Sequence, residues 1–337
     1  MNTEWTADGI MRMAGAYQAS CVLLAGVQLG LFTALDQGPR EETALASELG
    51  CMPRPFRMLL TALDSLGLVD RQNGVVSVSD TIRALLSKHS PDYLGFIIKH
   101  HGHIMPGWLK LVQAVHTGSR TTAETTLFTQ NLEEREDFLM GMFNVARLQA
   151  DRIAEALDLG GRRKLADIGG GPGTYAIFFC RKNPELEAVV FDLPTSEPFA
   201  RKTIDQYKLS DRVSFMPGDY LSDPLPEKQD VVWLSQVLHG ENPVNAAGLV
   251  KRAAATLNPG GLICIQEFML NDDRKGPPRA ALFGLNMLVE TDGGQAYTGE
   301  EITRMLTDAG AVRIRELAVV LPESCRILIG EMPQMMP

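Results

Sequence analysis

The chain has 337 residues, of which 45% are hydrophobic, and this is enough for two domains with separate cores. A formal net charge of −9 and an isoelectric point of about 5.3 disfavour a general nucleic-acid binder or a binder of anionic membranes. The five cysteines are scattered and never form a Cys-x-x-Cys pair, so we expect buried free thiols in a reduced cytoplasm. We find no signal-peptide pattern and no apolar stretch that we expect to span a bilayer.

Residues 1–90 are predicted to form short helices followed by a β-hairpin. The apolar side chains of the third helix recur at helical spacing, and Pro53 suits its first turn. Asn73-Gly74 is a favoured two-residue hairpin turn. The expected elements are helices over 22–32, 41–49 and 53–66 and a hairpin over 69–78. Three helices and a hairpin make a winged helix.

A winged helix raises the alternative of a DNA-binding regulator. The candidate recognition helix carries only Arg54 and Arg57 as basic residues, and residues 1–90 hold seven Lys/Arg against nine Asp/Glu. Contacts to phosphates supply most non-specific affinity for DNA, so this module is poorly equipped for it. The regulator stays a distant alternative, and it predicts salt-dependent binding to duplex DNA.

Residues 91–150 are predicted to be a helical connector that contributes to a substrate pocket. Four of the six histidines lie in it: His100, His101, His103 and His116. They have no cysteine and no regularly spaced carboxylate beside them, so we expect no metal, and either polar packing or a pocket-lining role for His103. The apolar run over 138–144 predicts a core helix, in which Met140 can also contact a flat aromatic ligand.

From residue 164 onward the pattern alternates strand and helix, which predicts a doubly wound parallel sheet. Helical stretches are expected after the first four strands, and two further strands are expected over 311–332. The parallel strands are expected to begin at Lys164, Ala188, Arg212, Asp230 and Leu262. Ligands of such sheets bind at the carboxyl ends of the strands, so candidate site residues are sought there.

The first of these strands runs into a cluster of glycines. Asp167 precedes Gly169, Gly170, Gly171 and Gly173, and a helical run follows at once. Glycines let the backbone approach a ligand closely, although a plain turn has the same pattern. Asp192 ends the second strand 19 residues past Gly173, where a parallel α/β unit places a carboxylate that binds a ribose. Asp167 would repel a pyrophosphate but suits an ammonium group, which points to S-adenosylmethionine.

The pattern Asp-x-Gly-Gly-Gly-x-Gly over 167–173 resembles the class I S-adenosylmethionine-dependent methyltransferases. It looks most like their plant and bacterial small-molecule O-methyltransferase branch. The resemblance implies a Rossmann-like catalytic domain over 151–337, S-adenosyl-L-homocysteine as a product, and a winged-helix domain that forms a homodimer. The apolar stretch over 11–32 is the natural surface for that dimer, although its side chains also fill the module's own core.

The resemblance also assigns residues to the cofactor. Asp192 and Leu193 match the family's ribose position, and the Gly-Asp-aromatic stretch carries an adenine contact over to Asp219 and Tyr220. A plain turn is the alternative for the second pair. Ser235 stands where a lysine usually helps to hold the cofactor, so the chain departs from the family's pattern at this position.

His239 follows the fourth strand, where an imidazole can remove a proton, and it matches the family's catalytic base. Glu267 ends the fifth strand and matches one of the two acids that frame that histidine; the second acid would fall at Ala296 and is missing. Met287, with Asn286 beside it, matches the methionine that packs on the acceptor ring. The alternatives are a structural histidine, a surface carboxylate and a core methionine.

The sequence thus predicts methylation of a hydroxyl group on a small aromatic or polyketide-like molecule, with His239 as the general base and no metal. A C- or N-methyltransferase would keep the cofactor site and change only the pocket. A family member that binds the cofactor without methylating would form no S-adenosylhomocysteine with any substrate that it turns over.

Overall fold

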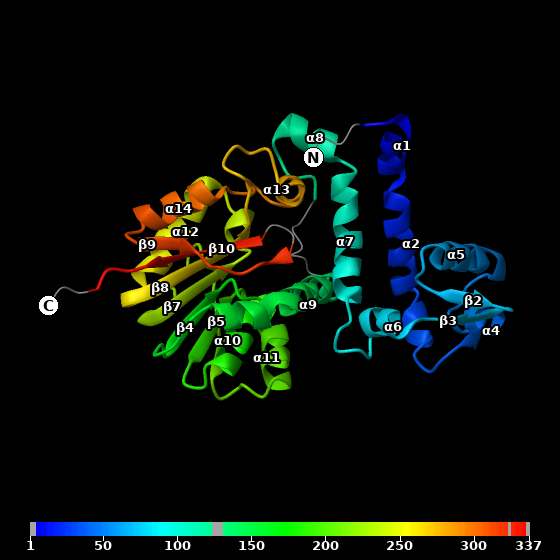
Figure 1. Ribbon diagram of the computed structural model, residues 1–337, viewed down its shortest axis with the longest axis horizontal. Helices are drawn as coiled ribbons and strands as arrows, with labels where there is room; N and C mark the ends of the chain where they lie inside the picture. The colour runs from blue at the N-terminus through cyan, green and yellow to red at the C-terminus, as the bar shows by residue number, and fades with distance from the viewer. Residues whose placement is uncertain (1–4, 123–130, 323–324, 335–337) are drawn as a thin grey trace. The chain divides into compact units, whose positions relative to one another are not determined.

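The computed structural model describes residues 5–122, 131–322 and 325–334 (Figure 1). The chain separates into two compact units, and the boundary falls between His103 and Ile104, inside a single helix, α7 (Gly95–Trp108). The predicted divisions at residues 90 and 150 remain predictions.

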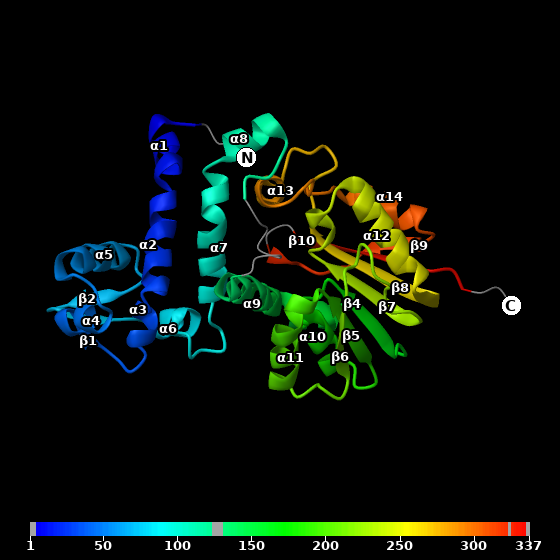
Figure 2. The ribbon, with the colours of Figure 1, turned by 180° about the vertical axis from the view of Figure 1, so that it is seen from behind.

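The N-terminal unit combines helices with a small antiparallel sheet of strand order β1-β3-β2 (Figure 2). Pro53 lies in the first turn of its helix, and Asn73 and Gly74 turn the hairpin with φ of 51° and 80°, as the sequence indicates. Its elements are α1 (Ala7–Gly15), α2 (Tyr17–Gln28), α3 (Leu31–Ala34), β1 (Arg40–Glu41), α4 (Glu42–Glu48), α5 (Pro53–Ser65), β2 (Asp70–Gln72), β3 (Val75–Ser77) and α6 (Asp80–Leu86).

One hydrophobic core holds this unit together. Phe32, Leu45, Leu60 and Val76 are almost fully buried in it, and they come from α3, α4, α5 and β3. Gly30, at φ +73°, ends α2 in the left-handed conformation and so lets α3 turn back onto this core. The winged helix is therefore a packed module of its own.

The two N-terminal helices correct one expectation. Together, α1 and α2 cover residues 7–28 with a mean hydropathy of 1.3, which by length and composition alone suffices to cross a membrane. The helix predicted over 22–32 therefore starts too late in the prediction, because helical structure already begins at Ala7. Most of this stretch is exposed in the structure, including Met11 and Met13.

The described part of residues 95–156 contains three helices: α7, α8 (Leu111–Thr117) and α9 (Leu132–Ala156). Asn131 caps α9 by accepting hydrogen bonds from the backbone N–H groups of Glu133 and Glu134. In the second unit, α9 packs against α10 (Thr174–Lys182).

The second unit contains a seven-stranded sheet with the order β6-β5-β4-β7-β8-β10-β9. The first five strands of that order are parallel, whereas β10 is antiparallel to both of its neighbours. The strands are β4 (Lys164–Ile168), β5 (Glu187–Asp192), β6 (Val213–Pro217), β7 (Gln229–Ser235), β8 (Leu257–Phe268), β9 (Val312–Glu316) and β10 (Cys325–Glu331). The predicted fold class, a Rossmann-like and mostly parallel sheet, is confirmed.

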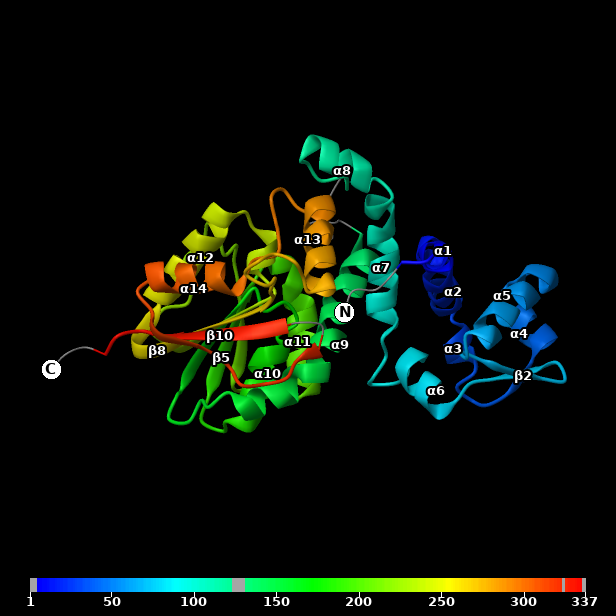
Figure 3. The same cartoon turned by 45° about the horizontal axis from the view of Figure 1, so that its top comes forward.

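Helices cover both faces of this sheet (Figures 1 and 3). α10 and α11 (Glu197–Gln206) pack on one face, and α12 (Pro243–Ala255) with α14 (Gly299–Asp308) packs on the other. The remaining helix, α13 (Pro278–Glu290), contacts α8, β8 and the short 3-10 helix η2 (Leu238–Gly240) that follows β7. α13 therefore lies next to the carboxyl ends of the central strands.

Two local features differ from the expectation. No helix follows β6, because residues 218–228 form turns that contain Pro224 and Pro226, and proline disfavours a continuing helix. β8 begins at Leu257 instead of the predicted Leu262, and it contains a bulge over 258–261, because Gln229 pairs with Leu257 while Val231 pairs with Leu262.

Candidate active site

The glycine loop lies between β4 and α10, and its conformation depends on glycine. Gly169, Gly171 and Gly173 have φ of +68°, +52° and +76°. A side chain at Gly170 would put its Cβ 2.7 Å from Cγ of Asp167, and one at Gly169 would lie 2.6 Å from a methyl group of Val237. The loop is thus a tight turn whose backbone carries no side chains.

Asp167 lies beneath this loop and is 1% exposed. Its Oδ2 accepts a hydrogen bond of 3.2 Å from the backbone N–H of Ala176. Burial raises the pKa of its carboxyl to about 7, and nearby Asp192 adds to this rise, whereas the hydrogen bond from Ala176 opposes it. A cation brought to the loop would favour the ionised form of Asp167.

Asp192 ends β5 on the neighbouring strand. Its carboxyl accepts hydrogen bonds of 2.7 Å from the backbone N–H groups of Gly171 and Leu193, and one of 2.8 Å from the hydroxyl of Ser196. Burial raises its pKa, although all three hydrogen bonds lower it. Asp192 therefore connects the glycine loop to the end of β5.

Asp219 and Tyr220 follow β6 in the segment that lacks the expected helix. Oδ1 of Asp219 accepts from the backbone N–H of Leu221 at 2.8 Å, so Asp219 begins a turn. The hydroxyl of Tyr220 donates to Glu241 at 2.9 Å. The side chain of Leu221 is 40% exposed, which leaves apolar surface beside Asp219.

Ser235, at the end of β7, belongs to a buried polar cluster. Its hydroxyl donates to Oε1 of Gln266 at 3.0 Å, and Nε2 of Gln266 lies 3.2 Å from the sulfur of Cys325. Gln236 donates to the same sulfur at 3.4 Å. Ser235 is thus bonded to the neighbouring strand, and it has no long cationic side chain that could reach a ligand.

His239 and Glu267 lie together, although 28 residues separate them. Nδ1 of His239 is 2.7 Å from Oε2 of Glu267, and the backbone N–H of His239 donates to Oε1 at 3.3 Å. The side chain of Glu267 is 2% exposed and that of His239 is 14% exposed. A buried carboxylate on Nδ1 fixes the imidazole orientation and leaves Nε2 as the nitrogen available to a substrate.

The ring of Phe283, on α13, meets the imidazole of His239 edge to face, with 4.6 Å between the ring centroids. Met287 is buried one turn further along α13. Asn286 accepts a hydrogen bond of 2.8 Å from Nε1 of Trp108. The predicted substrate residues on α13 therefore lie on the helix that contacts His239.

The other two predicted substrate residues are not brought to this cluster by any described contact. Met140 is buried in α9, and His103 is half-buried at the end of the N-terminal unit. At Ala296, where the second acid is missing, the side chain packs with Leu270 and Ala280 in a small apolar cluster. Among the described residues, the carboxylate bonded to the imidazole of His239 is that of Glu267 alone.

Two residues of this region were not predicted from the sequence. Gln236 adopts φ +59°, which is rare for a residue with a side chain, and its Oε1 is buried without a partner among the described residues. Glu290 ends α13 with a buried carboxyl oxygen that is likewise unpartnered. The only sequence signal was a single acid at the end of the apolar run over 283–289, which also fits an ordinary helix terminus.

The histidine cluster supplies no metal site in the described residues, which contain no group of three or more His, Cys, Asp or Glu side chains placed to hold an ion. His100 is 7% exposed, and burial, assisted by His101 and His103, lowers its pKa to about 3. The cysteines are free thiols; Cys180, Cys264 and Cys325 are buried, but Cys21 is exposed, contrary to the expectation that all are buried.

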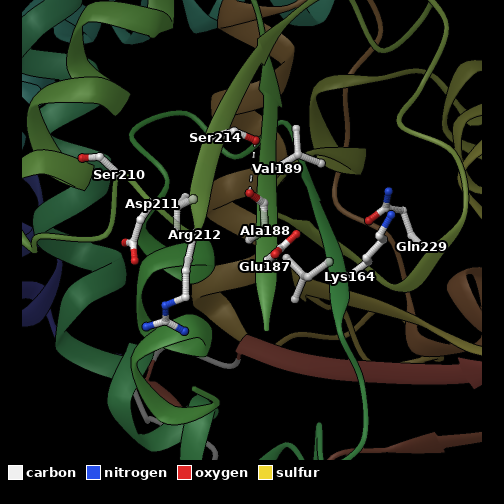
Figure 4. Close-up of a pocket in the computed structure, with 11 residues that line it drawn as sticks. Lys164, Glu187, Ala188, Val189, Ser210, Asp211, Arg212, Ser214 and Gln229 are labelled. Atoms are coloured by element: carbon white, nitrogen blue, oxygen red, sulfur yellow. Dashed lines mark hydrogen bonds between the residues drawn. The ribbon is translucent and has the colours of Figure 1, made fainter. Parts of the chain in front are cut away.

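A cavity of about 310 Å³ lies at the opposite end of the sheet, at the amino ends of β4, β5 and β6 (Figure 4). Lys164, Glu187 and Asp211 are among the residues that line it. Arg212, also at its wall, donates to the backbone carbonyl of Cys180 at 2.8 Å and so serves packing. Because parallel sheets bind ligands at their carboxyl ends, we assign this cavity no part in catalysis.

Two family models match the chain. Residues 109–311 match a model described as an O-methyltransferase domain. Residues 11–88 match a model described as an O-methyltransferase dimerisation domain.

Curated and solved proteins resemble the chain over most of its length. A 3-hydroxy-5-methyl-1-naphthoate 3-O-methyltransferase from Streptomyces sahachiroi is 34% identical, with 91% of this chain and 90% of that protein covered. The tetracenomycin polyketide synthesis 8-O-methyl transferase TcmO from Streptomyces glaucescens is 32% identical, with 96% of each covered. The crystal structure of human N-acetylserotonin methyltransferase in complex with SAM superposes with a TM-score of 0.88 at 27% identity, covering 99% of this chain and 100% of that one.

Proposed function

Because the chain belongs to the O-methyltransferase family, with both its catalytic and its dimerisation domain, we propose that it methylates a hydroxyl group of an aromatic or polyketide-like molecule. It is an S-adenosylmethionine-dependent O-methyltransferase. The similarity to one relative that acts on a naphthoate and another of tetracenomycin synthesis supports this class of acceptor.

The residues at the carboxyl ends of β4 and β5 fit S-adenosylmethionine. The loop over 169–173 presents bare backbone, and Asp167 beneath it offers a carboxyl to an ammonium group. Asp192 is suited to the ribose, and Asp219 and Tyr220 to the adenine. When bound, S-adenosylmethionine supplies a sulfonium-activated methyl group, which the acceptor oxygen receives.

His239 is the residue that we propose as general base. Glu267 accepts a hydrogen bond from the Nδ1–H group of His239, so Nε2 carries the lone pair that removes the proton of the acceptor hydroxyl. Glu267 then stabilises the positive imidazolium, because a buried carboxylate lies 2.7 Å from the ring. The ring of Phe283 packs against the imidazole and restricts its rotation. This His–Glu pair is the observation that carries the mechanism.

We further propose a homodimer formed through the N-terminal unit. The match to a dimerisation domain over 11–88 and the exposed apolar side chains of α1 and α2 support it. The same exposed face would be covered in a dimer, so it does not require a membrane. The free thiols support the proposed cytoplasmic location.

Binding to nucleic acid is not part of this proposal. On α5, the candidate recognition helix, Nε of Arg57 lies 2.7 Å from Oε1 of Glu42, and Arg71 pairs with the other oxygen of Glu42 at 2.6 Å. Burial raises the pKa of Glu42, but the two guanidinium groups outweigh burial, and the pKa is lowered overall. Glu42 thus offsets part of the positive charge beside α5, and residues 1–90 as a whole hold more acidic than basic side chains, which does not favour contacts to phosphates.

Incubation with S-adenosylmethionine and a panel of hydroxynaphthoates tests the proposal. We expect S-adenosylhomocysteine and a methyl ether in equal amounts, identified by mass spectrometry and by the chemical shift of the new methyl group. A product methylated on carbon or nitrogen would contradict transfer to oxygen. Turnover of any substrate without S-adenosylhomocysteine would indicate a non-methylating member, and a gel shift with duplex DNA would support the regulator.

A further inference from the structure

His239 lies on the short helix η2, and this turn has little support of its own. Two backbone hydrogen bonds of 3.0 and 3.1 Å close it, from the N–H groups of Glu241 and Gly240. A 3-10 turn has poorer hydrogen-bond geometry than an α-helix, so it depends on tertiary contacts. An added Cβ at Gly240 would meet no atom within 4 Å, so one side of η2 is open. The position of His239 therefore depends on what the rest of this segment contacts.

Glu241, the residue after η2, uses both of its carboxyl oxygens. The phenol of Tyr220 donates to Oε1 at 2.9 Å, and the side-chain amide of Asn245 donates to Oε2 at 3.0 Å. The backbone carbonyl of Glu241 accepts from the hydroxyl of Tyr297 at 2.6 Å. Glu241 thus joins three separate segments of the second unit at a point two residues from His239.

The bond from Tyr220 leads to the proposed cofactor site. Tyr220 follows Asp219 in the loop proposed for the adenine, and its backbone carbonyl accepts from Nη1 of Arg252 at 2.6 Å. Burial raises the pKa of the Tyr220 phenol well above its ordinary value, and the carboxylate of Glu241 raises it further. The phenol therefore keeps its proton and remains a hydrogen-bond donor to Glu241.

The segment before α14 holds the backbone of η2. The N–H of Gln295 donates to the carbonyl oxygen of His239 at 2.8 Å, and a Cβ at Gly294 would lie 2.5 Å from that same oxygen. Two kinds of contact thus hold η2. The first is this backbone packing, and the second is the carboxyl of Glu241, which connects η2 to the loop after β6.

We propose that Glu241 is a positioning residue that connects the adenine loop to the general base, so that binding of S-adenosylmethionine at Asp219 and Tyr220 fixes His239 in its reactive position. This proposal rests on the proposed function and adds to it a residue that acts through His239. A ligand that orders Tyr220 also orders Glu241 through their hydrogen bond, and one residue separates Glu241 from His239. A misplacement of about 1 Å can lower a rate by about 100-fold, so the placement of η2 affects catalysis directly.

Nuclear magnetic resonance tests the proposal without turnover. The protein is isotopically labelled at Cε1 of histidine, and the signal of His239 is identified by its loss in His239→Ala. We expect saturation with S-adenosylhomocysteine to shift this signal in wild-type protein, and Glu241→Ala to remove most of the shift. Tyr220→Phe breaks the same hydrogen bond from the other side, so it should have a similar effect. Calorimetry establishes that each variant is saturated.

Three further variants distinguish this connection from a general loss of structure. Asn245→Ala removes the other side-chain hydrogen bond to the carboxyl of Glu241 and should keep the response of His239. Glu241→Gln should restore most of the response that Glu241→Ala loses, because its amide oxygen can still accept from Tyr220. Glu316→Gln, which removes a carboxylate on the edge strand β9, should leave the response unchanged.

Kinetics supply a second readout. We expect Glu241→Ala to lower kcat by about 10–100-fold, because the base is misplaced, while the Kd of S-adenosylhomocysteine changes by less than about threefold. Tyr220→Phe combined with Glu241→Ala should lower kcat no further than Glu241→Ala alone, since both changes break one hydrogen bond. A purely structural role would instead weaken binding together with kcat.

An equal shift of the His239 signal in wild-type protein and Glu241→Ala would overturn the proposal, since the ligand would then act on the imidazole without Glu241. A wild-type signal that does not respond to saturation would overturn it as well, and so would an equal loss of response in Asn245→Ala. Should Glu241→Ala fail to fold, Tyr220→Phe carries the same test with the same outcomes.

Turnover separates this inference from the proposed function. Wild-type protein in which His239 responds through Glu241, but which forms no methyl ether with the hydroxynaphthoates, would contradict the proposed function and leave the role of Glu241 intact. Formation of the ether, with kcat and the response of His239 unchanged in Glu241→Ala, would contradict the role of Glu241 alone.

Discussion

Asp167 is a buried acid whose protonation competes with the proposed ligand. Its pKa of about 7 lies well above the ordinary value of 3.8, with burial as the main cause. Below pH 7 the carboxyl is mostly neutral and attracts an ammonium group weakly; above pH 7 it is ionised. The raised pKa therefore makes ligand binding tighter with rising pH, and binding should release protons.

We expect the affinity for S-adenosylhomocysteine to rise by up to about tenfold between pH 6 and pH 8, as measured by titration calorimetry. Asp167→Asn is the control, because it removes this titration while the amino group of the ligand still titrates. Its affinity should be lower at pH 8 and nearly independent of pH. A wild-type profile as flat as that of the variant would remove Asp167 from the site.

Some residues of the candidate site could be predicted from a local sequence pattern, and others could not. Asp167, Asp192 and His239 each lie at or just beyond the end of a parallel strand, so their positions followed from strand order. Glu290 and Gln236 could not be identified in this way. What distinguishes them is a buried oxygen with no hydrogen-bond partner in the described part of the chain, and burial depends on segments remote in sequence, as the Trp108–Asn286 bond across 178 residues illustrates.

At the scale of elements, the junction of β4 and α10 requires a residue without Cβ at position 170. An added Cβ there would lie 2.7 Å from Cγ of Asp167 and 3.0 Å from its carbonyl oxygen. At Gly248, within α12, nothing lies within 4 Å of the same added atom. The two glycines therefore form a matched pair for substitution experiments, because an added Cβ meets close neighbours at Gly170 and none at Gly248.

Gly170→Ala should destabilise the fold by about 1–3 kcal/mol and weaken binding of S-adenosylhomocysteine, because Asp167 must shift. Gly248→Ala should stabilise the protein by up to about 1 kcal/mol and leave binding unchanged, since alanine is the better helix former. Chemical unfolding and calorimetry measure both effects. Wild-type affinity in Gly170→Ala would show that the loop is no part of the binding site.

Elements with a strong periodic pattern were predictable, including the winged-helix hairpin, the five parallel strands and the antiparallel pair at the end. α14 begins with a capping box, in which the side chains of Thr298 and Glu301 bond each other's backbone. The absent helix after β6 and the bulge in β8 were missed. Pro224 and Pro226 are the local signal against a helix after β6, whereas the bulge depends on the pairing of β8 with β7, which local propensity does not encode.

At the scale of the whole molecule, the exposed face of α1 and α2 implies association of two chains. Ile10, Met11, Met13 and Tyr17 are each at least half exposed there, an arrangement that is costly for an isolated chain in water. A second copy is the occupant that the match to a dimerisation domain supports. The fold class and family could be predicted from sequence at this scale, but the acceptor could not, because its pocket combines side chains from segments far apart in the chain.

Met13→Asp should shift the protein from dimer to monomer in sedimentation experiments, because a carboxylate would be buried at the interface. Val320→Asp is the control: Val320 is 84% exposed and lies outside the N-terminal unit. A wild-type protein that remains monomeric at micromolar concentration, or equal behaviour of both variants, would contradict the proposed dimer.

The measurement that tests the central claim most directly is a comparison of wild-type protein with His239→Ala, by kcat for methyl transfer and by the Kd of S-adenosylhomocysteine. The account predicts that kcat falls by about 10²–10⁴-fold, the range typical of a lost general base, while the Kd stays within about twofold. Glu267→Gln keeps the shape of the His–Glu pair, so its kcat should lie between those of wild-type protein and His239→Ala. Full turnover in His239→Ala would contradict the account.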